Sequence, residues 1–274
     1  MLKVRIILRN MAVIVACFAV LTITGSCEKE DVYNGVELKL LDIVKSGLYS
    51  KRKFIYDDQH RIKEMHTFSD EVLLYKTILT YTAEDLTKCE YVYFEEGEVI
   101  DVSTTNYVKN GNTISWSSDV FIIDGEEKES ASIQHIFTLN TDGFPDKLEY
   151  ILLNTNSIIN YTYVNGNLTK HLYVSNIDGT LETRETNYTY DAYNYSAYSG
   201  CNTPKWFMFL IFFGQASYNT MTRSNYYETV DPMGFKGGYS KTYDYIYDKD
   251  GFPTKCTEKY DHGVQEITEF KYKN

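Results

Sequence analysis

Residues Tyr245 to Cys256 read Y-I-Y-D-K-D-G-F-P-T-K-C, which is a tyrosine-rich strand end, a polar turn and the start of a second strand. Units of this kind return at intervals of roughly 25 to 30 residues. The other copies are Phe54 to Met65, Leu79 to Cys89, Asn106 to Trp116, Ile136 to Leu148 and Tyr161 to His171. A regular period fixes the architecture before any single residue does, so we expect one repetitive domain.

A second short turn lies between successive units, for example at Asp124-Gly125 and Asp178-Gly179. Asp-Gly pairs supply the positive φ angles that tight hairpins need. One period is therefore two strands and two turns, and such short connections cannot make parallel crossovers. The sequence predicts an all-β fold, an antiparallel up-and-down meander of about 12 to 16 strands that forms a large curved sheet or a barrel-like structure.

Tyrosines recur at every second position of the predicted strands, as at Tyr91 and Tyr93 and again at Tyr243, Tyr245 and Tyr247. Mostly Glu, Thr, Asn or Asp stand between them. Alternate side chains of a strand point to opposite faces, so one face is aromatic and the other mostly polar. We expect the aromatic face to point inward.

Cys89 and Cys256 occupy the same position of the repeat, directly after Thr-Lys. The other copies carry Met65, Leu148 and His171 there. Because the position is mostly apolar, the simpler interpretation is a buried site where cysteine acts as a small hydrophobe. A Cys89–Cys256 disulfide is the alternative in an exported protein, and the pairing of Cys201 is equally open.

A closed barrel of 12 or more strands is hollow, so something must fill it or the sheet must flatten or stay open. The best candidate is the segment that interrupts the repeat, residues 201–238, because it holds the apolar run from Trp206 to Phe213. Thr203 as N-cap, Pro204 at the first helical position and Gly214 past the end indicate a short helix near 204–213. We expect this helix to be a buried structural plug. A buried strand and an exposed helix that docks on a membrane or a partner remain alternatives.

The first 26 residues have the features of an export signal. Lys3, Arg5 and Arg9 give a positive start, and the apolar run from Met11 to Ile23 is too short to span a bilayer. Removing them makes the net charge more negative by three than the −11 of the whole chain. Such a domain is repelled by nucleic acid and by anionic lipid, so we exclude both as partners of the domain itself.

Thr24-Gly25-Ser26 before Cys27 resembles a bacterial lipobox, in which the cysteine thiol carries a lipid. Thr24 departs from that pattern, which usually has Leu there. The acidic residues Glu28, Glu30 and Asp31 resemble the surface-export signal of Bacteroidetes-type lipoproteins. We therefore expect lipidation of Cys27, a tether over 27–36 and a single domain over 37–274, with a simply cleaved secretory signal as the alternative. The lipid would be the protein's contact with the membrane, because the predicted strands are too polar to face hydrocarbon.

The repeated Y-x-Y-D-x-x-G units, the lipobox-like start and the apolar segment before the last repeat resemble a family of uncharacterised Bacteroidetes surface lipoproteins with a porin-like fold. The individual units also resemble the tyrosine-aspartate repeats of large bacterial surface proteins. The resemblance covers about Lys53 to Lys273 and departs from the pattern at Asn106 to Trp116, which lacks the Lys. It implies a fold and a location at the outer membrane or cell surface, and it assigns no functional residue.

The sequence contains no recognisable catalytic motif. The five histidines, none in a zinc-binding spacing, are His60, His66, His135, His171 and His262. We therefore expect no metal, no cofactor and no catalytic residue, and we interpret the protein as a non-enzymatic binding or structural module. Its ligand would be a protein or a glycan stacked on exposed tyrosines or on Trp116. The alternative is a hydrolase of envelope material or polysaccharide with a carboxylate-based site; the oligomeric state stays open.

Overall fold

The computed structural model describes residues 32–33, 36–47, 50–83, 85–124, 127–152, 155–177, 180–212, 217, 219–231 and 235–273. The chain forms two units, Met1–Leu38 and Lys39–Asn274. In the first unit β1 (Val32–Tyr33) pairs antiparallel with β2 (Val36–Glu37). The expected signal peptide and Cys27 lie outside the described residues, so both stay predictions.

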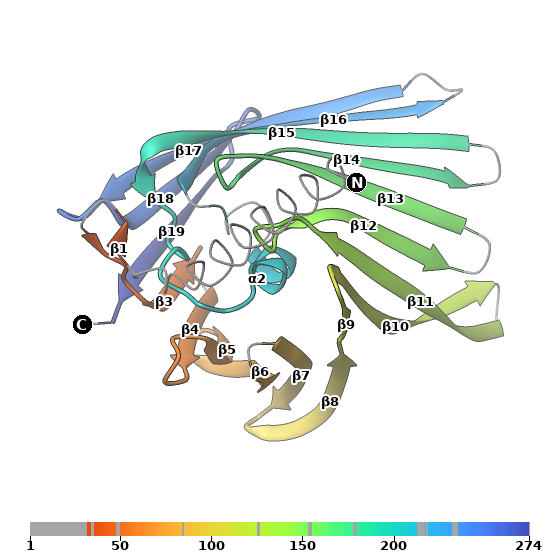
Figure 1. Cartoon of the computed structure of the whole chain (residues 1–274), viewed down its shortest axis with the longest axis horizontal. Coiled ribbons are helices and arrows are strands. Elements are labelled where there is room, and N and C mark those ends of the chain that lie inside the picture. The colour runs from red at the N-terminus through yellow and green to blue at the C-terminus, as the bar shows by residue number, and fades with distance from the viewer. Residues whose placement is uncertain are drawn as a thin grey trace, which may run out of the picture. The chain divides into compact units, whose positions relative to one another are not determined.

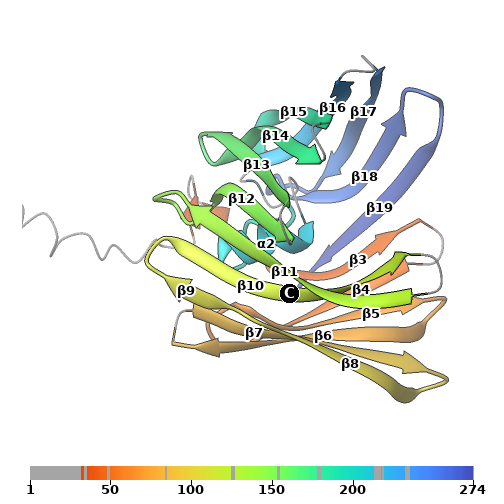
Figure 2. The ribbon, with the colours of Figure 1, turned by 90° about the vertical axis from the view of Figure 1, so that its right-hand side faces the viewer.

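The second unit is a closed barrel in which each strand lies antiparallel to its neighbours in sequence (Figures 1 and 2). Its first half contains β3 (Leu41–Ser46), β4 (Ser50–Tyr56), β5 (Ile62–Ser69), β6 (Val72–Thr82), β7 (Asp85–Glu95), β8 (Glu98–Asn106), β9 (Val108–Asn110) and β10 (Thr113–Asp124). Its second half contains β11 (Glu127–Leu139), β12 (Pro145–Leu152), β13 (Thr155–Val164), β14 (Asn167–Ile177), β15 (Thr180–Tyr195), β16 (Asn219–Asp231), β17 (Phe235–Tyr247), β18 (Pro253–Tyr260) and β19 (Gln265–Tyr272). The last strand, β19, pairs with β3 and closes the ring.

The described residues of the barrel form seventeen strand segments, but β8 and β9 are separated only by Tyr107. One residue is too short to reverse the chain, so β8 and β9 form one bent strand that pairs with β7 on one side and with β10 on the other. This leaves sixteen strands, an even number, as an up-and-down barrel with antiparallel closure requires. The predicted all-β meander is confirmed, and its strands form a nearly closed barrel.

Three equivalent turns explain why the repeat contains Asp or Asn followed by Gly. They begin at Asp57, Asn140 and Asp248, and in each the side-chain Oδ1 accepts hydrogen bonds from the backbone N–H groups two and four residues later, at 2.9 to 3.1 Å. The backbone N–H of the first residue donates to the carbonyl four residues on, at 2.8 to 2.9 Å. This geometry needs a positive φ three residues in, which is found at His60, Gly143 and Gly251. In these three copies the repeated sequence thus specifies one kind of hydrogen-bonded turn.

The tyrosine-rich face points inward, as predicted. Tyr161, Tyr188 and Tyr243 are buried, and the side chains that pack against the same core include Tyr91, Tyr163, Tyr190 and Tyr245. The shared cysteine position is buried too, since Cys89 is 0% and Cys256 is 6% exposed and both are free thiols. The apolar interpretation of these two cysteines is therefore confirmed. Met65 and Leu148 are buried at the same position, whereas His171 is only partly buried.

The predicted plug is the helix α2 (Lys205–Phe212), which lies inside the ring of strands (Figures 1 and 2). Its buried side chains are Trp206, Phe207, Met208, Phe209 and Phe212. Trp206 and Phe209 make edge-to-face contacts with Tyr107 and Tyr161, at 4.9 and 4.8 Å between ring centroids. Burial of five such side chains contributes about 8 to 15 kcal/mol before entropy costs, which is comparable to the net stability of a domain. The buried-plug prediction is confirmed.

The interruption of the repeat is shorter than the sequence indicated. Of the predicted insertion 201–238, residues 219–231 form β16 and β17 begins at Phe235, and both are regular strands of the barrel. The sequence did not indicate that β16 and the start of β17 continue the barrel, because they lack the usual turn motif of the repeat. Gly214, the expected end of the helix, lies outside the described residues.

Replacing Phe207 tests the plug. Because Phe207 is fully buried, Phe207→Ala should lower the free energy of unfolding by about 3 to 5 kcal/mol. Leu210→Ala, on the same helix but 37% exposed, should cost well below half of that. Urea unfolding followed by tyrosine and tryptophan fluorescence gives both values. Equal losses for the two variants would contradict the burial of α2.

Candidate functional site

The inner wall of the barrel changes chemistry along its strands. Two residues beyond buried Cys89, Ile114 and Leu148 the inward positions are held by Tyr91, Trp116 and Tyr150. The same step leads from Cys256 to Glu258 on β18. We name the inward side chains beyond the apolar ring the luminal polar zone. It comprises Tyr91, Tyr93, Trp116, His135, Tyr150, Tyr173, Glu182, Arg184, Tyr226, Glu228, Tyr239, Lys241, Glu258 and Tyr260.

One part of this zone is a stack of rings on β10, β11 and β12. The planes of Trp116 and His135 are 2° apart with centroids at 4.8 Å, and Tyr150 meets His135 edge-on at 5.1 Å. Ser118 Oγ lies 2.7 Å from His135 Nε2, while His135 Nδ1 has no hydrogen-bond partner among the described residues. Burial lowers the pKa of His135, so the imidazole is neutral at physiological pH.

A second part lies on β16, β17 and β18. Tyr226 and Tyr239 stack with their centroids 5.0 Å apart. The Lys241 ammonium lies 4.2 Å from the centre of the Tyr260 ring and binds Glu258 at 2.6 Å and the Tyr260 hydroxyl at 2.9 Å. Burial opposes the charge on Lys241, but these two hydrogen bonds prevail and raise its pKa. The cation is therefore fixed beside two aromatic rings.

Between these parts, β14, β15 and β16 carry a bridged charge cluster. The Arg184 guanidinium contacts Glu182 and lies 3.1 Å from Glu228, and it also faces the ring of Tyr173 at 5.5 Å. Both carboxylates therefore share one cation. The zone thus alternates aromatic faces with paired charges around the wall.

Solvent reaches this zone. Tyr93 is 37% and Tyr239 is 43% exposed although both point inward. The geometry agrees with the size of the barrel, because sixteen strands enclose more space than their own side chains fill. α2 has 8 residues and is about 12 Å long, whereas β15 has 16 residues and extends for about 50 Å. Among the described residues α2 is the one helix, so it fills one end of the lumen.

A pocket of about 520 Å³ lies at the plugged end, next to the N-terminus of α2. Its charged lining residues are Arg61, Asp85, Lys109, Asp142 and Lys205. Lys109 binds Asp85 at 2.5 Å, and Lys205 lies over the ring of Phe144 at 4.6 Å. The pocket is a second concavity, but its wall is largely occupied by contacts that hold the plug.

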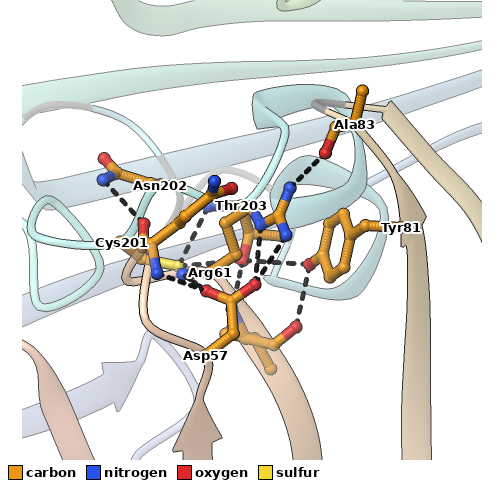
Figure 3. A network of polar contacts seen from close by, with 9 residues as sticks. Asp57, Arg61, Tyr81, Ala83, Cys201, Asn202 and Thr203 are labelled. Carbon is orange, nitrogen blue, oxygen red and sulfur yellow. Dashed lines mark hydrogen bonds and ion pairs between the residues drawn. The ribbon is translucent and has the colours of Figure 1, made fainter.

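Figure 3 shows those contacts. The Ile62 N–H donates to buried Thr203 Oγ1 at 2.7 Å, and the Tyr81 hydroxyl donates to the Ile62 carbonyl at 2.8 Å. The backbone and side-chain N–H groups of Asn202 donate to the carbonyls of His60 and Gln59, both at 3.0 Å. The segment before α2 is therefore hydrogen-bonded to the turn that precedes β5 and to the first residue of β5.

Thr203 does not have the role that the sequence predicted. Its hydroxyl forms hydrogen bonds with Ile62, Tyr81 and Cys201, all outside α2. The first helical hydrogen bonds go instead to the Pro204 carbonyl, from Phe207 and Met208 at 2.9 and 3.0 Å. The N-cap interpretation of Thr203 is wrong, because the barrel wall competes successfully for its oxygen.

Arg61 stands where the equivalent turns carry buried Phe144 and Phe252. Its guanidinium lies over the Tyr81 ring at 4.2 Å, donates to the Ala83 carbonyl at 2.6 Å and binds Asp57 at 2.7 Å (Figure 3). Although partial burial opposes the charge, hydrogen bonds from Arg61 and from the turn lower the pKa of Asp57. Arg61 therefore takes the position that phenylalanine holds in the other two turns, and it stabilises its own turn by binding Asp57.

The histidines are dispersed. His60 and His262 lie in turns, and His66 is bound to Glu64 at 2.8 Å on the outer face. His171 lies 2.9 Å from the Tyr188 hydroxyl, and burial lowers its pKa to about 4. No group of three potential metal ligands occurs among the described residues. Sequence reasoning found Trp116 but missed His135, Arg184 and Lys241, whose inward direction follows only from strand register.

The outer face carries ion pairs around the barrel. They include Lys88–Glu90 on β7, Lys147–Glu149 on β12, Lys170–Glu185 between β14 and β15, and Lys259–Asp244 between β18 and β17, at 2.6 to 3.0 Å. The first two pairs flank buried Cys89 and Leu148, so their side chains point outward. Within the described part of the chain, no helix has the length and apolarity needed to cross a bilayer.

No family model and no curated protein matches the chain. A solved porin-like protein from Bacteroides vulgatus ATCC 8482 superposes with a TM-score of 0.54 at 15% identity, over 86% of this chain and 99% of that chain. The chain has a porin-like fold. A second porin-like protein, from Bacteroides uniformis ATCC 8492, aligns at 11% identity with a TM-score of 0.44, over 85% and 98% of the two chains. At such low identity the first likeness shows the fold alone.

Replacing Thr203 tests the attachment of the plug. Thr203→Val leaves the Ile62 N–H buried without an acceptor, which should lower the free energy of unfolding by about 1 to 3 kcal/mol. Thr254→Val, which removes a hydroxyl that donates to the Ile246 carbonyl at an exposed position, should change it by about 0.5 kcal/mol or less. Urea unfolding measures both, and amide exchange at Ile62 should accelerate only in the first variant. Unchanged exchange there would contradict the contact.

Proposed function

We propose that this protein is an exported, lipid-anchored cell-surface module that binds a glycan inside its barrel and performs no chemistry on it. The luminal polar zone carries this proposal. Tyr93 and Tyr239 present rings to solvent within an enclosed wall, and Arg184, Lys241 and Glu258 stand between the aromatic groups. Binding sites in proteins combine apolar and aromatic surface with a few fixed polar groups in this way.

A glycan suits this zone because a sugar has an apolar face of C–H groups and a rim of hydroxyls. Aromatic rings cover the face, and charged groups that are already held in place accept or donate to the rim. The pairing of Lys241 with Glu258 and of Arg184 with Glu228 fixes these groups before a ligand arrives. Preorganised groups lose less entropy on binding. A protein ligand is the less favoured choice for this zone, because the lumen is concave and its rings are separated by charges.

The outer face supports an anchor through lipid rather than through the barrel wall. A membrane-spanning barrel needs an apolar belt on its outside, whereas ion pairs such as Lys88–Glu90 and Lys147–Glu149 would have to be desolvated in hydrocarbon. The barrel therefore stands in water, at the outer membrane or cell surface, and Cys27 provides the attachment.

A hydrolase finds less support. A glycosidase needs a carboxylic acid with a raised pKa, but the pKa shifts of carboxyl groups in the described residues are all downward, at Asp57, Glu71, Glu185, Asp248 and Asp261. Ser118 and His135 resemble a nucleophile and its base, yet no group orients the Nδ1 side of the imidazole among the described residues. We therefore favour binding without catalysis.

Glycan-array binding with the full chain tests the ligand class. Tyr239→Ala should weaken binding of the selected glycan at least tenfold, because it removes an exposed inward ring. Tyr227→Ala is the matched control, since Tyr227 is 57% exposed on the opposite face of β16. The same glycan incubated with the protein should release no new reducing ends. Equal effects of the two variants would exclude the lumen, and new reducing ends would establish the hydrolase.

Replacing Cys27 tests the anchor. In a bacterial host supplied with labelled palmitate, the natural chain should incorporate label and sediment with membranes, and Cys27→Ser should do neither. Cys201→Ser, which changes a free cysteine inside the barrel, should behave like the natural chain. Label retained in Cys27→Ser would contradict lipidation and favour the simply cleaved signal.

A further inference from the structure

The wall of the barrel contains a seam. β9 pairs with β10 through three residue pairs only, from Val108↔Ser115 to Asn110↔Thr113. Beyond them β8 pairs with β7 and β10 pairs with β11, and Figure 1 shows β8 and β10 running apart. On the sides that face each other, β8 and residues 116–124 of β10 thus have no hydrogen-bonded strand partner among the described residues. We name the space between these two edges the seam.

A groove marks the corner where the seam begins. It has a volume of about 280 Å³ and is lined by both edges. β8 and β9 contribute Thr104, Asn106 and Val108, and β10 contributes Ser115, Trp116 and Ser117. Residues of the two diverging strands therefore line one groove. Such unpaired edges are templates for an added strand.

The edge of β8 lacks two of the features that usually protect an edge strand, namely basic residues and proline. Val99, Ile100 and Val102 are all more than 50% exposed. The sequence of β8, E-V-I-D-V-S-T-T-N, is rich in β-branched residues and contains no Lys, Arg or Pro. Natural proteins place such residues on edges to prevent pairing, and β-branched residues favour it. A bulge at Ile100 is the one irregularity of its ladder with β7.

Charge selects the kind of strand that would fit. β8 carries Glu98 and Asp101, and the hairpin before it carries Glu95 and Glu96. The sequence of β10 contains Asp119 and Asp124 and no basic residue. An added strand therefore meets the acidic residues of β8 and gains most when it is basic.

We propose that the seam binds an extended basic peptide of another polypeptide, which adds as a β-strand between β8 and β10. One inserted strand gives a hydrogen-bonding partner to both edges, whereas a second copy docked through β8 gives a partner to one of them. The chain's own segment after Cys27 fits poorly, since Glu28, Glu30 and Asp31 repeat the charge of the seam. This inference does not rest on the glycan proposal, because the seam is in the wall and its groove shares only Trp116 with the luminal polar zone.

The probe is a synthetic peptide of about nine residues that alternates lysine with valine or threonine, long enough to span β8. Fluorescence anisotropy should detect saturable binding to the full chain. Val102→Lys should weaken it at least tenfold, because Val102 is 51% exposed on the edge and a lysine there repels the peptide. Val164→Lys is the matched control, since Val164 is 55% exposed away from the seam and the change in net charge is the same. It should weaken binding less than twofold.

A second probe separates strand addition from charge attraction. The same peptide with alternate backbone amides methylated keeps its charge but loses its donors, and it should bind at least tenfold more weakly. Equal binding of the methylated peptide, or equal losses in Val102→Lys and Val164→Lys, would overturn the proposal. Sedimentation of the full chain as a dimer that Val102→Lys dissociates would overturn it in favour of a second copy. Loss of glycan binding with the peptide bound normally would affect the glycan proposal alone.

Discussion

A barrel of sixteen strands cannot be filled by the side chains of its own wall, and the rest of this structure follows from that constraint. The solution is partial. An eight-residue helix and the segment before it occupy one end, where the inward positions are apolar and where Phe207 and Trp206 meet the rings of the wall. Beyond the reach of the helix the same strands change to tyrosine, histidine and paired charges. The boundary between the apolar and the polar part of the lumen therefore lies where the plug ends.

The fold was largely predictable because it depends on local rules that recur. The Asp or Asn that accepts two backbone N–H groups recurs in three copies, two of which have Gly at the position of positive φ, and the alternation of Tyr with polar residues recurs along the strands. The plug was readable as well, since eight consecutive large apolar residues cannot stay in water. The predicted extent of the interruption, residues 201–238, failed because β16 has the right alternation but lacks the turn motif that signals a repeat.

The candidate site was mostly beyond sequence reasoning. Whether Arg184 points inward depends on the register of β15 against β14, and a shift of one residue would reverse it. Likewise, the sequence around Thr203 is typical of a helix N-cap, but its hydroxyl accepts a hydrogen bond from the N–H of Ile62, which lies 141 positions earlier at the start of β5. The seam depends on how β8 bends at Tyr107, which has no signature in a single sequence. Tyr107 packs against Trp206 and Phe207, so the plug and the bend share a contact.

The ladder between β19 and β3 joins the last strand of the chain to the first strand of the barrel, with the Thr268 hydroxyl meeting that of Ser46 across 222 positions. Before β19 pairs, β3 and β18 each have one edge without a hydrogen-bonded strand partner. Closure at such separation is entropically costly and slow. The ring therefore closes only when β19, a strand of eight residues, pairs with β3, and until then two unpaired strand edges are open to pairing with other chains.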